Sequence, residues 1–134
     1  MVTIADTFVT LLNVAAASYT NLGVKPGIFQ AKKESWRKIA KNAGKKGSQL
    51  RVANVNNEVA QSSDATVIFS TQTGSIRGRS NSQAFCDQLF LDVKSLITSN
   101  SGVKQRVFIT GETEPTPISK NLYEFEIIAQ RIDF

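Results

Sequence analysis

The chain has 134 residues, of which 41% are hydrophobic and 20% are charged, and its formal net charge is +5. This length suits one hydrophobic core, so we expect a single domain over residues 1–134. The chain has no histidine and one cysteine, which excludes Ser-His-Asp, Cys-His and histidine-metal chemistry as well as an intrachain disulfide. The longest apolar run near the start, 11–17, is too short for a membrane span and lacks the basic flank of a secretion signal, so no membrane association is expected.

The first predicted element is an amphipathic helix that begins after Thr3. Apolar residues recur every three to four positions over Ile4–Tyr19, and the Thr3 hydroxyl can cap the first turn. Asp6 is well placed for the positive end of this helix. We expect the helix to end near Gly23, because Pro26 follows closely.

The next segment, 25–51, holds most of the positive charge. Nine of its residues are basic and Glu34 is its single acid, so the segment carries +8 and the rest of the chain −3. Its pattern predicts a weak helix from about Gln30 to Ala43, followed by a flexible Gly-Lys-Lys-Gly tip and the start of a strand. We treat this lysine-rich helix, tip and strand start as part of the single domain.

This basic segment is the strongest candidate for a binding surface. Lysines on a helix and at a glycine-flanked tip can neutralise phosphates without reading bases, which gives salt-sensitive and sequence-indifferent binding. Docking onto an acidic patch of another subunit, or solvation alone, explains the pattern equally well. Two more arginines follow on one side of a later strand. The candidate contacts with nucleic acid or an acidic partner are Lys32, Lys33, Arg37, Lys38, Lys41, Lys45, Lys46, Arg51, Arg77 and Arg79.

From Leu50 the apolar period changes to two, which predicts strands. Leu50 and Val52 have the opposite parity to Val55 and Val59, so we expect a bulge or bend near Ala53 and Asn54. A polar turn over 60–64 and a β-branched run over 66–73 complete a predicted hairpin. Residues 75–79 can extend its second strand.

The longest amphipathic pattern predicts the main helix, over 81–98. Ser80 and Gln83 have capping-box spacing, and an apolar stripe follows that includes Phe85, Leu89 and Val93. Cys86 lies on the same side of this helix. We expect it to be a buried small hydrophobic residue, since no histidine is present to activate its thiol.

Two more strands are predicted, over 103–110 and from Asn121 towards Phe134, with a proline-containing loop over 111–117 between them. The apolar parity of the last strand changes along its length, which indicates a bulge or a shift of the apolar face from the core to a partner. A long terminal strand can also pair with a neighbouring subunit. The expected subunit contacts are Tyr123, Phe125, Ile128, Ile132 and Phe134.

These elements predict the α+β class, with a small, mostly antiparallel, twisted sheet of about four strands, one main amphipathic helix packed on it, and an N-terminal helix. The sequence contains no EF-hand, phosphate-binding loop or dinucleotide fingerprint, so we expect no cofactor and no enzymatic activity. The remaining possibility for an enzyme is a carboxylate-metal site around Glu112 and Glu114, near Asp133 or near Glu124 and Glu126 after folding.

The order of elements in the second half points to a family. It comprises a strand at 66–73, a Gly-Ser-Ile-Arg-Gly-Arg-Ser linker, the main helix, a strand at 106–110, a proline-containing loop, and a last strand that ends in Glu-Ile-Ile-Ala-Gln-Arg-Ile-Asp-Phe. Over 64–134 this order resembles the tail-terminator, or tail-completion, proteins of long-tailed bacteriophages. The lysine-rich segment 25–51 departs from that family's pattern.

The resemblance implies a structural virion protein without catalytic residues. It would form a ring, usually of six subunits, that caps the finished tail tube and joins it to the neck, with DNA passing through the centre. Its partners would be other copies of itself, the tail tube and the neck or connector proteins, and it would be assembled in the host cytoplasm. The alternative is a small nucleic-acid-binding, coat or packaging protein that uses the basic segment and the two later arginines without sequence preference.

Overall fold

The computed structural model describes residues 3–15, 28–30, 49–61, 68–99 and 107–133. Over these residues it contains two helices and five strands in the order α1 (Ile4–Ala15), β1 (Ile28–Gln30), β2 (Gln49–Gln61), β3 (Ile68–Ser80), α2 (Gln83–Ser99), β4 (Val107–Ser119) and β5 (Leu122–Asp133). The described strands form one sheet in the order β1-β2-β3-β5-β4, in which the β1–β2 pair is parallel and the other pairs are antiparallel. The predicted α+β class, with a main helix on a mostly antiparallel sheet and an N-terminal helix, is confirmed.

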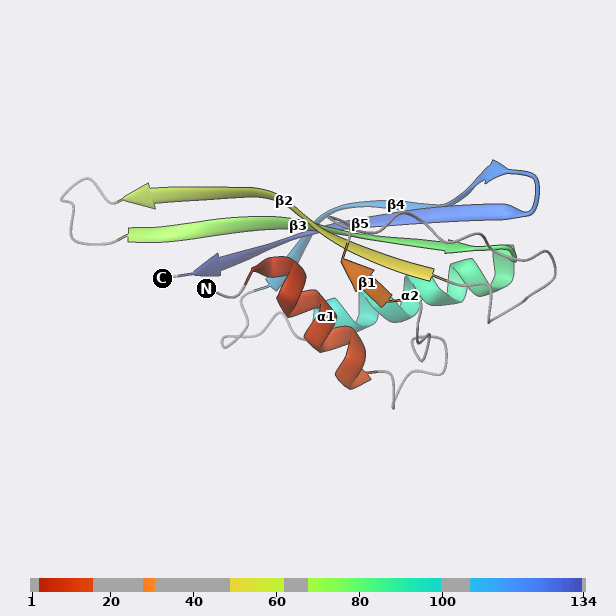
Figure 1. Ribbon diagram of the computed structural model, residues 1–134, viewed down its shortest axis with the longest axis horizontal. Helices are drawn as coiled ribbons and strands as arrows, with labels where there is room; N and C mark the ends of the chain where they lie inside the picture. The colour runs from red at the N-terminus through yellow and green to blue at the C-terminus, as the bar shows by residue number, and fades with distance from the viewer. Residues whose placement is uncertain (1–2, 16–27, 31–48, 62–67, 100–106, 134) are drawn as a thin grey trace.

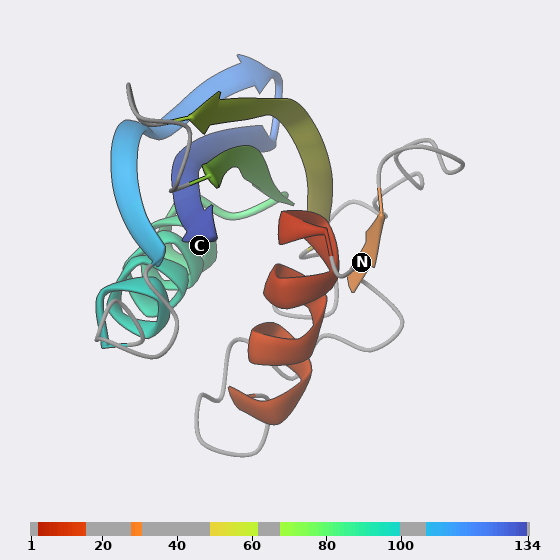
Figure 2. The same cartoon turned by 90° about the vertical axis from the view of Figure 1, so that its left-hand side faces the viewer.

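Both helices cover the same face of the sheet (Figure 1), and the sheet curves strongly above them (Figure 2). The core lies between these two layers. It is built from the apolar stripes of α1 and α2 and from alternate residues of the strands, among them Ile4, Phe8, Leu12, Leu89, Val93, Leu50, Val52, Ile76, Phe125 and Ile127. Neither of the two described helices is long and apolar enough to cross a membrane.

The start of α1 is fixed by polar side chains of the sheet. Thr3 and Asp6 form a reciprocal cap, in which the Asp6 amide donates to Thr3 Oγ1 at 3.2 Å and the Thr3 amide donates to Asp6 Oδ2 at 3.1 Å. The Ile4 amide donates to Gln72 Oε1 at 2.9 Å, and the Ala5 amide donates to Asn54 Oδ1 at 3.0 Å. The buried Arg131 donates to the Thr3 carbonyl. Amides that a helix start leaves without intrahelical partners are thus bound by β2 and β3, which sets the position of α1 on the sheet.

Two glycines of β3, Gly74 and Gly78, leave room for core side chains to pack directly against the strand backbone. A Cβ at Gly74 would lie 2.7 Å from Phe8 Cε2. A Cβ at Gly78 would overlap the ring of Phe125, which is 1% exposed and packs edge-on against Phe90 with 5.4 Å between ring centroids. The space that a side chain would occupy is therefore filled by aromatic rings.

The predicted irregularity in the first hairpin is confirmed. The β2–β3 register shifts between Asn54 and Asn56, so Val55 is an extra residue on β2. The predicted extension of the second strand is also confirmed, because β3 continues to Ser80. The first strand is longer than expected and runs to Gln61, into the predicted turn.

The predicted loop over 111–117 is wrong, because β4 continues through it to Ser119. The strand accommodates its glycine and prolines at the edge of the sheet, where three register shifts place extra residues on β4 relative to β5. Glu114 and Pro115 together lie opposite Phe125. The reversal of the chain comes after β4, where Asn121 adopts a φ of 60°, a left-handed conformation that asparagine tolerates.

The start of α2 differs in detail from the predicted capping box. The Ser82 carbonyl accepts the first helical bond, from the Cys86 amide at 2.9 Å, so Ser82 is the capping residue. Ser80 Oγ accepts from the Ser82 amide at 3.3 Å and so shapes the turn before the helix. The predicted apolar stripe of this helix is confirmed, and it buries Cys86, Leu89, Phe90, Val93, Leu96 and Ile97.

The last strand contains no bulge relative to β3. One register holds from Tyr123 to Asp133, and the buried side chains Phe125, Ile127, Ala129 and Arg131 alternate along it. Ile128 and Ile132 lie on the other face of the sheet. The parity change therefore does not come from a bulge in this strand. It arises because Ile128 and Ile132 place apolar side chains on the face away from the core.

We predict that Gly78→Ala lowers the free energy of unfolding by about 1 to 3 kcal/mol, because the added methyl group displaces a buried ring. Gly111→Ala is the matched control, since its Cβ would meet Ile128 atoms at 3.9 Å, an ordinary contact. Urea unfolding at one fixed protein concentration measures both variants. Equal stability of the two variants would contradict the packing described for Phe125.

Candidate functional site

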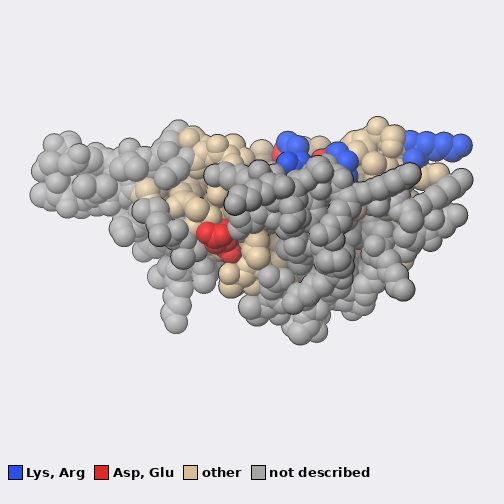
Figure 3. Space-filling model, viewed as in Figure 1, with Lys and Arg blue, Asp and Glu red and all other residues tan. Residues whose placement is uncertain are grey.

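Three of the predicted basic contacts lie together on the face of the sheet away from α1 and α2, which we call the outer face. Arg51 of β2 is opposite Arg77 of β3, and Arg77 is opposite Glu126 of β5. Arg79 is opposite Glu124. We call these five residues the arginine face. Figure 3 shows Lys and Arg side chains along the upper edge of the molecule, which in Figure 1 is the side away from the helices.

Two of these arginines make ion pairs within the subunit. Arg77 Nε lies 2.7 Å from Glu126 Oε2, and this hydrogen bond is the largest cause of a raised pKa for Arg77. Ser75 Oγ donates to the same carboxylate oxygen at 3.2 Å. Arg79 Nη2 lies 3.3 Å from Glu124 Oε2. Three arginines against two glutamates leave the arginine face with a formal charge of +1.

The outer face is hollowed beside the arginines. A depression of about 390 Å³ is lined by Arg51, Ala53, Val55, Ser75, Arg77, Glu126 and Ile128. We call it the outer hollow. Val55, the extra residue of the β2 bulge, is 61% exposed there, and the side chain of Arg77 keeps 49% of its surface exposed. The outer hollow thus combines an apolar surface with guanidinium groups.

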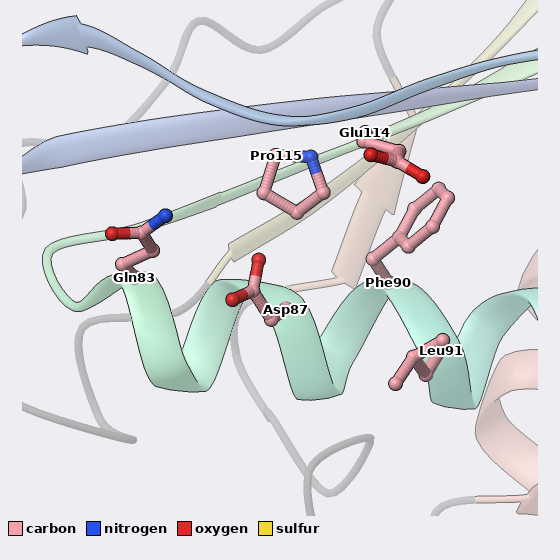
Figure 4. Close-up of a pocket in the computed structure, with 6 residues that line it drawn as sticks. All are labelled: Gln83, Asp87, Phe90, Leu91, Glu114 and Pro115. Atoms are coloured by element: carbon pink, nitrogen blue, oxygen red, sulfur yellow. The ribbon is translucent and has the colours of Figure 1, made fainter.

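A second depression of similar size, about 400 Å³, lies on the helix side between α2 and β4. We call it the α2–β4 pocket, and Figure 4 shows its lining residues, Gln83, Asp87, Phe90, Leu91, Glu114 and Pro115. Gln83 and Asp87 project from α2 towards the strands, whereas Leu91 points away from them and is 54% exposed. This pocket combines an apolar surface with two carboxylates.

One of the expected subunit contacts, Phe125, is contradicted by its burial. Phe125 belongs to the core, so its side chain is used within the subunit and is not a surface contact. Tyr123 is half-buried and packs against the same core. The backbone of β5 also cannot pair with a neighbour, because β3 and β4 occupy its two edges. The sequence could not reveal this, since strand order depends on contacts between distant segments.

Other expected contacts are either on the outer face or outside the described residues. Ile128 and Ile132 are half-buried on the outer face, and Phe134 is not among the described residues. Seven of the ten basic candidates, from Lys32 to Lys46, also lie outside them, as does the predicted helix apart from Gln30, which belongs to β1. The outer hollow and the α2–β4 pocket were not predicted as sites. The sequence feature that pointed towards the outer hollow was the change of apolar parity at Val55, which predicted the bulge.

The acidic residues considered for a metal are held in different places. Glu112 Oε1 lies 3.0 Å from Lys94 Nζ on the helix side, whereas Glu124 and Glu126 face the arginines on the outer side. Within the described ranges, no three or more Cys, Asp or Glu side chains are grouped so that they could hold a metal ion.

Cys86 is fully buried on α2, as predicted. Burial raises the pKa of its thiol to about 12, and the charges of Asp87 and Glu124 act in the same direction. The thiolate is the reactive form of cysteine, so this environment suppresses its chemistry.

No protein-family model matches the chain, and no curated protein matches it in sequence. Among solved structures, the chain is similar to one in the structure described as "Virion of native gene transfer agent (GTA) particle". The two are 14% identical, the match covers 95% of this chain and 92% of that chain, and the TM-score is 0.54. At this identity the likeness shows a shared fold.

We predict that Cys86 does not react with an aromatic disulfide reagent at about pH 8 in the native protein, because its thiolate form is depleted and its sulfur is covered. After unfolding in concentrated guanidinium chloride, one thiol per chain should react rapidly. Absorbance of the released thiolate measures both states. Rapid labelling of the native protein would contradict the burial of Cys86.

Proposed function

We propose that this chain is a structural protein of a phage-like virion, and that it acts as a tail terminator. In this role it forms a homo-oligomeric ring, the hexamer that the family resemblance implies, which ends the tail tube and connects it to the neck. The observation that carries the proposal is the match of nearly the whole chain to the fold of a chain in a virion structure. The order of elements over 64–134 supports the same role independently.

The surfaces of the described residues suit assembly. The outer hollow and the α2–β4 pocket each combine exposed apolar atoms with charge, and both are broad and open. Exposed apolar surface edged by polar groups is typical of protein contacts. The proposed partners are further copies of the chain, the tail tube and the neck or connector proteins. The role requires no catalysis, and it places the protein in the virion after assembly in the host cytoplasm.

The basic segment 25–51 also receives a role in this proposal. Its formal charge of +8 suits a position along the channel beside DNA, or against an acidic neighbouring ring. The segment would belong to the same single domain as the sheet and both helices.

We expect purified protein at about 10 μM to give a mass several times that of the 14.6 kDa chain by light scattering, because the assembly depends on repeated subunit contacts. Negative-stain electron microscopy should show annular particles, alone or at one end of added tail tubes. A 14.6 kDa species under both conditions would argue strongly against the ring.

The alternative function, sequence-nonspecific binding of nucleic acid, is favoured by the gathering of Arg51, Arg77 and Arg79 on one face. The ion pairs with Glu124 and Glu126 weaken it, because they compensate the charges of Arg77 and Arg79 within the subunit. If DNA is contacted, the basic segment therefore supplies more of the binding than the arginine face does.

We predict that Lys45→Gln with Lys46→Gln lowers the slope of log affinity against log salt for duplex DNA by about two. Arg77→Gln with Arg79→Gln is the matched pair and should lower it by less, since glutamates neutralise these arginines. Fluorescence anisotropy with two unrelated duplexes from about 50 to 200 mM salt measures both. If the arginine variant changed the slope more than the lysine variant, the arginine face would be the main DNA contact. Absence of binding at low salt would exclude the alternative function.

A further inference from the structure

We infer that the outer hollow and the α2–β4 pocket are two halves of one interface between copies of this chain. The exposed side of α2 in one copy docks into the outer hollow of the next. This inference rests on the proposed oligomeric function and specifies which surfaces build it.

Three exposed residues of α2 follow one another at intervals of four: Gln83, Asp87 and Leu91. Because this spacing turns slowly around the helix, Gln83 and Asp87 face the strands whereas Leu91 faces outwards (Figure 4). All three line the α2–β4 pocket. With 54% of its surface exposed, Leu91 presents an apolar side chain that a second molecule can cover.

The outer hollow offers the complementary surface. Its apolar atoms come from Ala53, Val55 and Ile128, and Val55 is 61% exposed. A leucine that enters this hollow would remove apolar surface of both copies from water. The outer hollow and the α2–β4 pocket therefore each offer apolar surface to the other. In the inferred interface, Leu91 of one copy contacts Val55 of the next.

The charges of the two surfaces have opposite sign. The α2–β4 pocket has the carboxylates of Asp87 and Glu114 and no basic side chain among the described residues that line it. The outer hollow is lined by Arg51, Arg77 and Glu126, so its lining residues carry a formal charge of +1. Arg77 uses its Nε for Glu126, yet about half of its side chain remains exposed. Carboxylates of one copy can thus approach guanidinium groups of the next, which favours this pairing over others.

Pairing like with like is disfavoured by the same charges. Two α2–β4 pockets in contact would bring four carboxylates together, and two outer hollows would bring arginines together. The remaining arrangement places the α2–β4 pocket of one copy against the outer hollow of the next. Because these two surfaces lie on opposite faces of the sheet, the copies are arranged head to tail. Such contacts repeat from copy to copy and close into a ring when the rotation between copies permits.

Cysteine cross-linking tests this contact directly. In the full-length chain carrying both Val55→Cys and Leu91→Cys, mild oxidation should give a ladder of covalent oligomers on non-reducing gels. Either single variant alone should give no cross-link, because the contact joins different surfaces. A mixture of the two single variants should give covalent dimers and nothing larger. The native Cys86 is buried and should not contribute.

Charge insertion gives the second measurement. Leu91→Asp should remove the high-mass species seen by light scattering at about 10 μM, with a loss of affinity of at least about tenfold. Ile118→Asp is the matched control, because Ile118 is 44% exposed on β4 but lines neither hollow. Circular dichroism on both variants checks that they fold.

The outcomes separate this interface from the proposed function. Wild-type rings without a cross-link between positions 55 and 91 would overturn the interface and leave the ring intact. Cross-linking of either single variant to itself would overturn the head-to-tail arrangement. Covalent ladders from the double variant, together with a wild-type protein that is monomeric at about 10 μM, would support the interface but contradict a ring that is stable in solution. A monomeric wild type without cross-links would overturn both.

Discussion

The close packing of Phe125 over Gly78 fixes the alignment on which both faces of the sheet depend. Only a residue without a side chain leaves room for that ring, and Phe90 holds the ring from the α2 side. Because successive residues of a strand point to opposite faces, this inner pair sets Arg77 opposite Glu126 and Arg79 opposite Glu124 on the outer face. A slip of one residue would place charged groups in the core and aromatic rings in water, which makes the register strongly specified.

The outer hollow and the α2–β4 pocket both lie at bulges in the strands that flank the β3–β5 pair. Val55 is the extra residue of β2 and becomes one of the most exposed apolar side chains of the outer face. On β4, Glu114 and Pro115 share the position opposite Phe125, and both line the α2–β4 pocket. Bulges redirect side chains and increase local twist, so the same device shapes a candidate contact surface on each face. The core remains continuous beneath them, because β3 and β5 keep one register throughout.

Local patterns predicted the features that depend on local physics. The stripe of α2, the Thr3 cap of α1 and the irregularity near Asn54 follow from residue spacing, and all three are found. Features that depend on distant contacts were predicted less well. Residues 111–117 have the composition of a loop, yet pairing with β5 and an edge position make them a strand. Phe125 was assigned to a subunit contact because alternation alone cannot tell which face a sheet buries. The hollows escaped prediction because each combines elements that are distant in sequence.

The edges of the sheet bear on the proposed assembly through faces. β4 forms one edge of the sheet, but its prolines and register shifts interrupt the regular row of amides and carbonyls that an added strand requires. A strand from a neighbour would therefore find little continuous backbone to pair with at the β4 edge. At the other edge, β1 covers β2 only from Leu50 to Val52 among the described residues, and the bulge at Val55 interrupts the row of amides and carbonyls beyond it. The outer face and α2 offer apolar surface and opposite charge instead, and their positions on opposite sides of the sheet would let each copy contact two others in the proposed ring.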